Sequence, residues 1–463
     1  MKLFTKNQKE TSVRPIVFVD IQSWKEMAKG VKLENEATIA DFSGKGGQIL
    51  KTIDQKGQIE TIYAGTSFKD EDPRNWITLF AKLSSSLPEG TYKPEGWPDD
   101  KWYQAGLGWG LGRYEFDRYK KEKKEPLKKI LLVPEEAPTE FWQNSLNSVV
   151  LARDLINTPA SDMGPEDLVR QAAEVANRFQ AQLRTVRGED LLLEGFPAVY
   201  AVGKGSERAP VLMDLRWGQK DHPKLTLVGK GVVFDTGGLN LKPAAGMRNM
   251  KKDMGGGAVS LALASLIMAE KLPVNLRLLI PAVENSPGMR AYRPGDVLET
   301  RKKITVEVGN TDAEGRLILC DALTCAAEEE PDLILDFSTL TGAARVALGQ
   351  DLPPFYTPDS KIAHELFRAA EIVGDPLWQM PLWGPYRKSL KSDIADLSNV
   401  SSSPLAGSIT AALFLYEFVK PAKNWVHFDI FGWRNSAMPG FPKGAEANAL
   451  RAVFKFLANR YPH

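Results

Sequence analysis

Apolar and polar positions follow two different periods from about residue 151 to the end of the chain. Short apolar runs such as "KLTLVGKGVVFD", "NLRLLIPAVE" and "PDLILDFSTL" have the length and the flanking turns of buried strands. Between them, "EDLVRQAAEVANRF", "GAVSLALASLIMAEK" and "ITAALFLYEFV" carry apolar residues at helical spacing. This alternation predicts an α/β/α arrangement with a mixed central sheet under helices.

The first third of the chain has a different pattern of apolar and polar residues. Between residues 16 and 133, short apolar runs such as "PIVFVD" and "KKILLVP" are mixed with turn-rich polar stretches, which predicts a small α/β unit. The segment "FWQNSLNSVVLARDLINTPASD" has helical spacing and ends near Pro159, so we expect a helix that joins two domains. We therefore predict a small N-terminal α/β domain over residues 1–150 and a larger domain over residues 151–463.

Composition narrows the class of protein. Lys and Arg total 59 against 58 for Asp and Glu, so no strong overall charge favours nucleic acid or an anionic membrane. There is no apolar run of about 18 residues, and the start "MKLFTKNQKETS" lacks the apolar segment of a signal peptide. The two cysteines, Cys320 and Cys325, lie in one predicted helix and are expected to be buried thiols. We predict a cytoplasmic protein.

Carboxylates and basic residues gather beside glycine-rich turns at predicted strand or helix ends. In open α/β sheets, sites form where strands end and loops begin. Three segments combine these features: "GKGVVFDTGGLNLKP", "MKKDMGGGAVSL" and "NTDAEGRL". Their charged residues of interest are Lys230, Asp235, Lys242, Asp253, Asp312, Glu314 and Arg316. Two carboxylates and a guanidinium within "NTDAEGRL" are more than a turn requires.

Each residue has a simple structural explanation when it is taken alone. Asp253 could cap the helix that follows it, and Lys230 and Lys242 could be solvated surface lysines. Together, hard oxygen donors at several strand ends are what a pair of divalent cations needs. Lys230, inside an apolar strand, would be costly as an ammonium, but it could be a ligand as a neutral amine if the cations lowered its pKa strongly.

Several other kinds of site find no support in the sequence. "HELFR" at His364 lacks the second histidine of a zinc helix, and His427 in "WVHFDI" is expected to be a hydrogen-bonded core residue. Phosphate-binding, dinucleotide-binding and nucleophile-elbow motifs are missing at the required spacing.

The quoted segments resemble those of the leucyl (cytosol) aminopeptidases, the two-metal exopeptidases of the M17 type. "NTDAEGRL" matches the signature octapeptide of that family without a change, and "VGKGVVFDTGGLNLKP" and "MKKDMGGGA" are similar to its two preceding metal-site segments. "ARDLINTPAS", "DFSTLTGAAR", "DLSNV" and "GSITAALFL" extend the resemblance over most of the chain after residue 151. "GRYEFDRYK" resembles the family more weakly.

The resemblance implies two divalent metal ions, zinc or manganese, in the larger, catalytic domain. The implied ligands are Lys230, Asp235, Asp253, Asp312 and Glu314. In the family pattern Asp235 and Glu314 bridge the two ions. Lys230 and Asp253 then complete the tighter site, and Asp312 serves the more exchangeable one.

The resemblance also implies catalytic and substrate-binding residues. Lys242 would polarise the scissile carbonyl, and Arg316 would hold a bicarbonate ion that acts as general base. Asp253 and Lys242 would contact the substrate, and the pocket for its first side chain would be lined by Met250, Thr339 and Gly342. Two departures bear on this pocket: Phe431 stands where an alanine is expected, and Thr236 replaces a serine.

We therefore expect a metal-dependent aminopeptidase that acts on peptides with leucine or other apolar first residues. The family further implies a homohexamer, with an oligomerisation or regulatory role for the N-terminal domain. Two alternatives stay open: a two-magnesium phosphatase or nucleotidyl transferase, and a DNA-binding regulator. The near-zero net charge makes nucleic acid an unlikely partner, and a phosphoryl site has little use for an amine ligand.

Overall fold

The computed structural model describes residues 2–6, 13–29, 31–97, 99–123, 125, 127–420, 422 and 424–462. Its internal contacts divide the chain into two compact units. The first comprises residues 1–147 with the short segments 372–374 and 436–443, and the second comprises residues 148–371, 375–435 and 444–463. Helix α5, Thr139–Asn157, spans the point at which the chain passes from one unit to the other.

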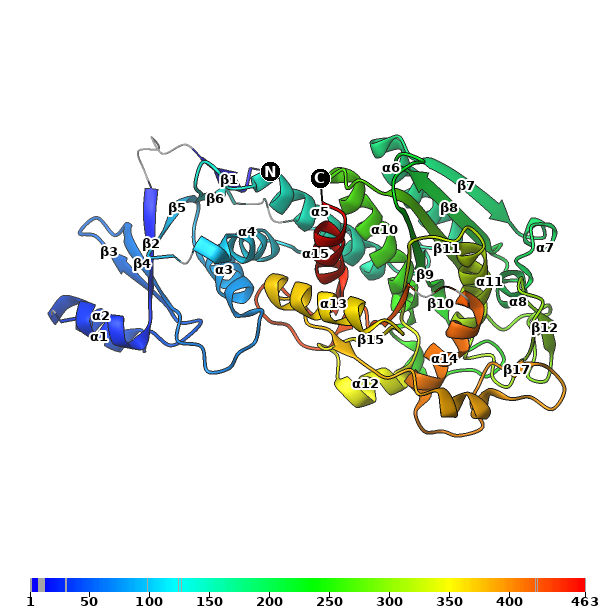
Figure 1. The fold of residues 1–463 in the computed structure, drawn as a ribbon. Coiled ribbons are helices and arrows are strands. Elements are labelled where there is room, and N and C mark those ends of the chain that lie inside the picture. Colours follow the sequence, from blue (N-terminus) through cyan, green and yellow to red (C-terminus); the bar gives the residue numbers. More distant parts are fainter. Residues whose placement is uncertain are drawn as a thin grey trace. The chain divides into compact units, whose positions relative to one another are not determined.

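The N-terminal unit is a six-stranded sheet with the strand order β1-β6-β5-β2-β4-β3 (Figure 1). Its strands are parallel except for β3, which pairs antiparallel with β4 at one edge. The strands are β1 Phe4–Thr5, β2 Val13–Val19, β3 Ile49–Ile53, β4 Ile59–Gly65, β5 Gly90–Glu95 and β6 Lys129–Leu132. The helices are α1 Ile21–Met27, α2 Val31–Ile39, α3 Asn75–Ser86 and α4 Trp102–Leu111, with the short 3-10 helix η1 at Asp99–Lys101.

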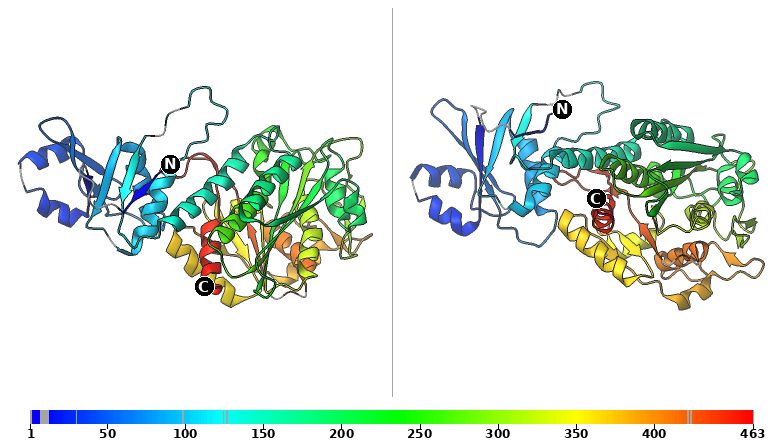
Figure 2. Two further views of the ribbon diagram at one scale, coloured as in Figure 1. Left: turned by 90° about the horizontal axis from the view of Figure 1, so that it is seen from above. Right: turned by 45° about the horizontal axis from the view of Figure 1, so that its top comes forward.

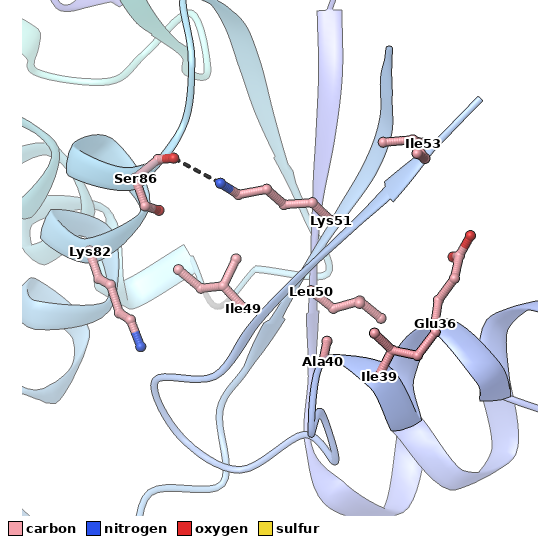
Figure 3. A pocket seen from close by; sticks show the side chains of 9 residues that line it. All are labelled: Glu36, Ile39, Ala40, Ile49, Leu50, Lys51, Ile53, Lys82 and Ser86. Atoms are coloured by element: carbon pink, nitrogen blue, oxygen red, sulfur yellow. Dashed lines mark hydrogen bonds between the residues drawn. The ribbon is translucent and has the colours of Figure 1, made fainter. Parts of the chain in front are cut away.

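A shallow hollow in this unit is lined by the end of α2, by β3 and by α3 (Figure 3). Lys51 donates a hydrogen bond from Nζ to the carbonyl oxygen of Ser86 at 2.8 Å, while Ile39 and Ile53 are exposed. None of the carboxylate-rich segments contributes to this hollow. The predicted chemistry therefore has to be sought in the second unit.

The second unit is built on a nine-stranded mixed sheet. Its order is β16-β15-β18-β14-β9-β11-β8-β7, and β10 also pairs with β11. The strands β18, β14, β9 and β11 run parallel in its centre, and the antiparallel pairs lie towards the edges. The strands are β7 Gln182–Arg187, β8 Val211–Trp217, β9 Lys224–Gly229, β10 Gly231–Asp235, β11 Asn275–Asn285, β14 Leu333–Ser338, β15 Pro354–Tyr356, β16 Trp378–Gln379 and β18 Trp425–Asp429.

Helices pack on this sheet in two groups (Figures 1 and 2). Contacts join α10 to α6, to α15 and to the central strands, and they join α11 to α8, to α14 and to the same strands. The helices are α6 Pro165–Phe179, α7 Asp190–Leu193, α8 Pro197–Gly203, α9 Ala244–Met247, α10 Gly255–Ala269, α11 Gly315–Ala327, α12 Gly342–Leu348, α13 Ser360–Val373, α14 Gly407–Val419 and α15 Leu450–Arg460. The predicted α/β fold with a mixed sheet and helices is confirmed.

Smaller elements complete the second unit. A three-stranded sheet joins β12 Val297–Glu299, β13 Thr305–Glu307 and β17 Leu397–Ser398, and a two-stranded sheet joins β19 Trp433–Arg434 and β20 Gly444–Ala445. The 3-10 helices η2 Met250–Met254 and η3 Gly384–Leu390 lie between larger elements. Among the described residues, no helix is both long enough and apolar enough to cross a bilayer.

The carboxyl ends of the parallel strands place the charged segments together. Strand β10 ends at Asp235, which lies opposite Asn285 at the end of β11, and β14 ends at Ser338 beside β9. Because parallel strands end at a common edge of the sheet, the loops that follow them converge there. This edge is where the sequence places its candidate residues.

Candidate active site

Lys230 occupies a break between two strands, and not the interior of a single apolar strand as the sequence suggested. Strand β9 ends at Gly229 and β10 begins at Gly231. The backbone N–H of Lys230 donates to the carbonyl oxygen of Phe337 at 2.9 Å, and its own carbonyl accepts from Gly257 at 2.7 Å. These bonds to β14 and to the first turn of α10 satisfy the backbone at the break and fix the position from which the side chain leaves.

The side chain of Lys230 is almost completely buried and joins two carboxylates. Its Nζ lies 2.7 Å from Oδ2 of Asp253 and 2.8 Å from Oε1 of Glu314. A Cβ added at Gly315 would lie 2.6 Å from Cε of this lysine. The glycine of "NTDAEGRL" is therefore what allows the lysine to pass the start of α11.

Lys242 makes the second such bridge. Its Nζ lies 2.8 Å from Oδ2 of Asp235 and 2.5 Å from Oδ1 of Asp312. The interpretation of Lys230 and Lys242 as solvated surface lysines is wrong, because both are held in ion pairs at the sheet edge. The capping role for Asp253 is also not observed, since α10 begins without a side-chain cap hydrogen bond.

The carboxylates form one compact group. Asp235, Asp312 and Glu314 each present an oxygen within 4.8 Å of the other two. Asp253 joins them through the shared contact with Lys230. In the described part of the chain, the buried atoms Oδ2 of Asp253, Oδ1 of Asp312 and Oε1 of Glu314 accept no well-aligned hydrogen bond, although each lies near a lysine.

Burial and mutual proximity raise the pKa values of two carboxylates in this group. Burial, reinforced by Asp235, raises the pKa of Glu314 to about 8, and burial with Asp253 raises the pKa of Asp235 to about 6. Burial opposes the ammonium form of Lys230, but Asp253, Glu314 and Asp235 outweigh it and raise its pKa. The predicted role of Lys230 as a neutral ligand would therefore require bound cations, since the protein's own charges hold the proton on it.

This donor set fits divalent metal ions. Hard or borderline dications bind oxygen ligands that lie close together, have free lone pairs and lack enough positive charge around them. The unaligned carboxylate oxygens of Asp253, Asp312 and Glu314 are the structural observation that supports this assignment. A cation among them would supply the positive charge that the two lysines only partly provide.

Three supporting residues were missed by sequence reasoning. Asn285 donates from Nδ2 to Oδ1 of Asp235 at 2.8 Å and to the carbonyl of Thr311 at 3.0 Å. Tyr292 donates its hydroxyl to the same carbonyl at 2.6 Å. Asn399 receives the backbone N–H of Gly309 and donates to the carbonyl of Asn310, each at 2.8 Å. Together these bonds orient one carboxylate and hold the "NTDAEGRL" loop.

Arg316 lies in the first turn of α11, beside the carboxylate group. Its Nη1 donates to the carbonyl of Asn399 at 2.8 Å, and its guanidinium carbon lies 6.0 Å from the centre of the Phe414 ring. Its buried Nε has no hydrogen-bond partner among the residues that the structure describes. Burial lowers the pKa of Arg316 to about 10. The side chain therefore keeps a donor available for an anion.

The three predicted pocket residues differ in their surroundings. Thr339 is buried and donates its hydroxyl to Oδ1 of Asp253 at 2.7 Å, so it orients a carboxylate of the group. Met250 is half-buried in η2, three residues before Asp253, and Gly342 is exposed at the start of α12. Their role in binding the first side chain stays a prediction.

His427 and His364 take the structural roles expected of them. His427 is fully buried in β18, and its Nδ1 lies 2.6 Å from Oδ1 of Asp336. Burial opposes its charged form, but Asp336 raises its pKa above the usual value. His364 lies exposed on α13 and its Nδ1 contacts the carbonyl of Ser360. Both cysteines are buried thiols of α11.

The sequence of this chain is similar to family models and to known proteins over most of its length. Residues 150–454 match the catalytic domain of the cytosol aminopeptidase family, and residues 13–133 match the N-terminal domain of M17 aminopeptidases. A probable cytosol aminopeptidase of Syntrophotalea carbinolica is 41% identical over 363 residues, which are 75% of this chain and 73% of the relative. A similar protein of Chlorobaculum tepidum is 36% identical over 459 residues, 90% of this chain and 91% of the relative.

Solved structures agree in fold over nearly the whole chain. The crystal structure of the cytosol aminopeptidase from Coxiella burnetii has a TM-score of 0.91 and 44% identity, and it covers 98% of both chains. A bottromycin maturation enzyme in complex with Mn has a TM-score of 0.88 at 28% identity, over 98% of this chain and all of that one. The chain therefore belongs to the cytosol aminopeptidase family, M17, and is a metal-dependent aminopeptidase, a hydrolase of peptides.

Proposed function

We propose that this enzyme removes the first residue of peptides, with leucine or another apolar residue preferred, by means of two divalent cations. The observation that carries the proposal is the compact group of carboxylates at the sheet edge, three of which approach within 4.8 Å. The proposed ligands are Lys230, Asp235, Asp253, Asp312 and Glu314. By the family pattern, Asp235 and Glu314 would hold both ions, Lys230 and Asp253 would complete the tighter site, and Asp312 would serve the more exchangeable one.

The ions are zinc or manganese. When bound, they supply Lewis acidity and lower the pKa of water at the site, so that hydroxide is available near neutral pH. The related bottromycin enzyme was solved with Mn, which supports manganese as one of the candidates. Oxygen ligands with a single amine suit either metal.

Lys242 stabilises the negative charge that develops on the scissile carbonyl oxygen. Its Nζ is held by Asp235 and Asp312, and its side chain is only 15% exposed. Burial opposes the charged form, but Asp235 and Glu314 outweigh it, so the pKa of Lys242 is raised and the group stays an ammonium at neutral pH. A fixed cation in a site shielded from water is effective at stabilising an oxyanion.

Asp253 explains why the cleavage is confined to the chain end. The free amine of a substrate is a cation that pairs with this buried carboxylate, and a blocked amine or an internal peptide bond has no such charge. Thr339 fixes the orientation of the carboxylate by its hydrogen bond to Oδ1. Met250, Thr339 and Gly342 line the pocket for the first side chain.

Arg316 holds a bicarbonate ion that acts as general base. A guanidinium can grip two oxygens of a planar anion, and the buried Nε of Arg316 has no other partner in the described chain. The first turn of α11 adds backbone N–H groups that favour an anion at the same place. A bicarbonate held by Arg316 would supply the base for the proton of the attacking water.

Four further features belong to the proposal. We place the division between the N-terminal domain and the catalytic domain at residue 150, and we assign the first an oligomerisation or regulatory role. The enzyme assembles as a homohexamer and works in the cytoplasm. The family resemblance supports these features, and light scattering on the purified chain tests the assembly.

The deciding experiment compares a peptide with leucine at its free amino end and the same peptide acetylated. Chelator-treated enzyme is assayed alone and after addition of zinc, manganese, cobalt or magnesium, with Glu314→Gln and the surface variant Glu365→Gln as a matched pair. We expect free leucine from the unblocked peptide only, restored by zinc or manganese, lost in Glu314→Gln and kept in Glu365→Gln. Equal cleavage of the acetylated peptide would refute the role of Asp253 and the exopeptidase assignment.

A further inference from the structure

Two cations beside the metal centre have no obvious partner. Lys252 is 2% exposed, and its side chain makes no close ion pair with a described residue, although the neighbouring carboxylate of Asp253 acts on its charge. Arg345 on α12 has a buried Nη1 without a hydrogen bond, and its nearest carboxylate oxygen, on Asp429, lies 3.9 Å away. Both residues therefore carry donor groups for which the described chain supplies no well-placed acceptor.

Asp429 is already occupied by other donors. Its oxygens accept the backbone N–H groups of Leu340 and Thr341 and the hydroxyl groups of Thr341 and Ser408. With four donors on two oxygens, this carboxylate has little capacity left for Arg345. Asp429 therefore offsets the charge of Arg345 only in part, and Asp253, which acts on the charge of Lys252, is itself paired with Lys230.

Phe431 brings the two cations together. Nζ of Lys252 lies 5.0 Å from the centre of its ring, and the guanidinium carbon of Arg345 lies 4.9 Å from the same centre. Cation–π contacts of this kind hold a charge in place without neutralising it. An alanine at position 431, the residue expected from the family pattern, would offer no ring to either cation.

The three residues lie on the Asp253 side of the metal centre. Lys252 directly precedes Asp253, and Phe431 directly precedes Gly432, where an added Cβ would lie 3.4 Å from the methyl group of Thr339. Thr339 in turn is bonded to Asp253. Because Asp253 is the proposed partner of the substrate amine, the side chain of the first substrate residue is the nearest part of the substrate to this group.

We propose that Lys252 and Arg345, held by Phe431, form a subsite for an acidic first side chain, so that the enzyme also removes N-terminal glutamate or aspartate. The proposal rests on the aminopeptidase function proposed above and defines a substrate class for it. The carboxylate of the substrate supplies the missing counter-charge, and the Phe431 ring contacts its aliphatic stem. Charged hydrogen bonds of this type are among the stronger ones in proteins.

The test uses p-nitroanilides of glutamate, glutamine and leucine on one enzyme preparation. Glutamine has the shape of glutamate without its charge, so the glutamate-to-glutamine ratio of kcat/KM isolates the effect of the carboxylate. The variants are Lys252→Met and Arg345→Gln. Lys251→Met is the matched control, because Lys251 donates to the carbonyl of Asn157 and contacts the ring of Trp433, away from Phe431.

We expect wild-type enzyme to prefer glutamate over glutamine, and each variant to lower that ratio by about tenfold, as loss of one charged hydrogen bond predicts. Hydrolysis of the leucine substrate should change little, and Lys251→Met should behave like wild type. A ratio near one in the wild type, or a ratio unchanged in both variants, overturns the subsite. Absence of leucine hydrolysis in the wild type would instead count against the proposed function itself.

Discussion

Replacement of Gly315 by alanine tests whether the position of Lys230 governs catalysis. The added Cβ would lie 2.6, 2.7 and 2.8 Å from Cε, Nζ and Cδ of Lys230. Carbon atoms in proteins prefer separations of about 3.5 to 4.0 Å, so the lysine has to withdraw by roughly 1 Å. It cannot do so freely, because Asp253 and Glu314 hold its Nζ at 2.7 and 2.8 Å.

The expected cost to stability is modest and the cost to activity is large. Overfilling a packed site typically costs about 1–3 kcal/mol, and the better helix propensity of alanine in α11 returns up to about 1 kcal/mol. Displacement of a functional group by about 1 Å can lower the rate by about 10²-fold. We therefore expect Gly315→Ala to fold, to lose at most about 3 kcal/mol of unfolding free energy and to lose about 10²-fold in kcat/KM.

The assay is hydrolysis of leucine p-nitroanilide together with denaturant unfolding of the same preparation. Gly384→Ala serves as the control, because a Cβ at Gly384 would meet no atom within 4 Å. It should match the wild type in both measurements. Full activity of Gly315→Ala would show that Lys230 can move without consequence, and it would refute its assignment as a metal ligand.

Two further predictions concern other residues of the catalytic unit. Burial raises the pKa of Asp321 to about 7, although three backbone N–H groups donate to its carboxylate. The protonated carboxyl therefore contributes its full stabilisation to the folded state below about pH 4, and this contribution is lost as the pH rises through 7. Denaturant unfolding at several pH values should accordingly show a flatter profile for Asp321→Asn, and a profile parallel to wild type would contradict this. Arg316→Met should lower kcat by roughly 10²–10⁴-fold and abolish any response to added bicarbonate, since a general base contributes about that much. If Arg316→Met and the wild type had the same kcat at every bicarbonate concentration, Arg316 would have no part in the mechanism.

Most helices and strands can be predicted from local patterns of apolar residues, but the order of the strands in the sheet cannot. The strands β9, β11 and β14 and the helices α6, α10 and α14 lie where the apolar periodicity predicts them, because each buries its own apolar face. The sheet order depends on contacts between segments far apart in the chain. For example, β14 pairs with β9, which precedes it by about a hundred residues. No local pattern encodes such a pairing.

In the candidate site, too, some residues could be predicted from local sequence patterns and others depend on contacts made only in the folded chain. The acidic residues could be found because each stands beside a glycine-rich turn at the end of an element. Asn285 could have been found by the same rule, since it closes β11 next to Asp235. Asn399 could not, because its partners are the backbone N–H of Gly309 and the backbone carbonyl of Asn310, and a backbone partner cannot be recognised in the sequence. The pairing of each lysine with two acids likewise needs the folded chain.

The charge balance of the site explains why it contains two lysines. Lys230 contacts Asp253 and Glu314, while Lys242 contacts Asp235 and Asp312, so each of the four carboxylates has one lysine. Burying four carboxylates together without counter-charge would be prohibitively costly.

The two lysines reduce that cost enough for the strand ends to converge, yet they leave the group with an excess of acids over bases. The raised pKa values of Asp235 and Glu314 are the signature of this residual crowding. Divalent cations held as proposed would relieve it, and they would compete with the proton on Lys230. If Lys230 is the ligand that we propose, affinity for metal should depend on how readily this lysine gives up its proton, so its surroundings would matter as much as the proposed acidic ligands.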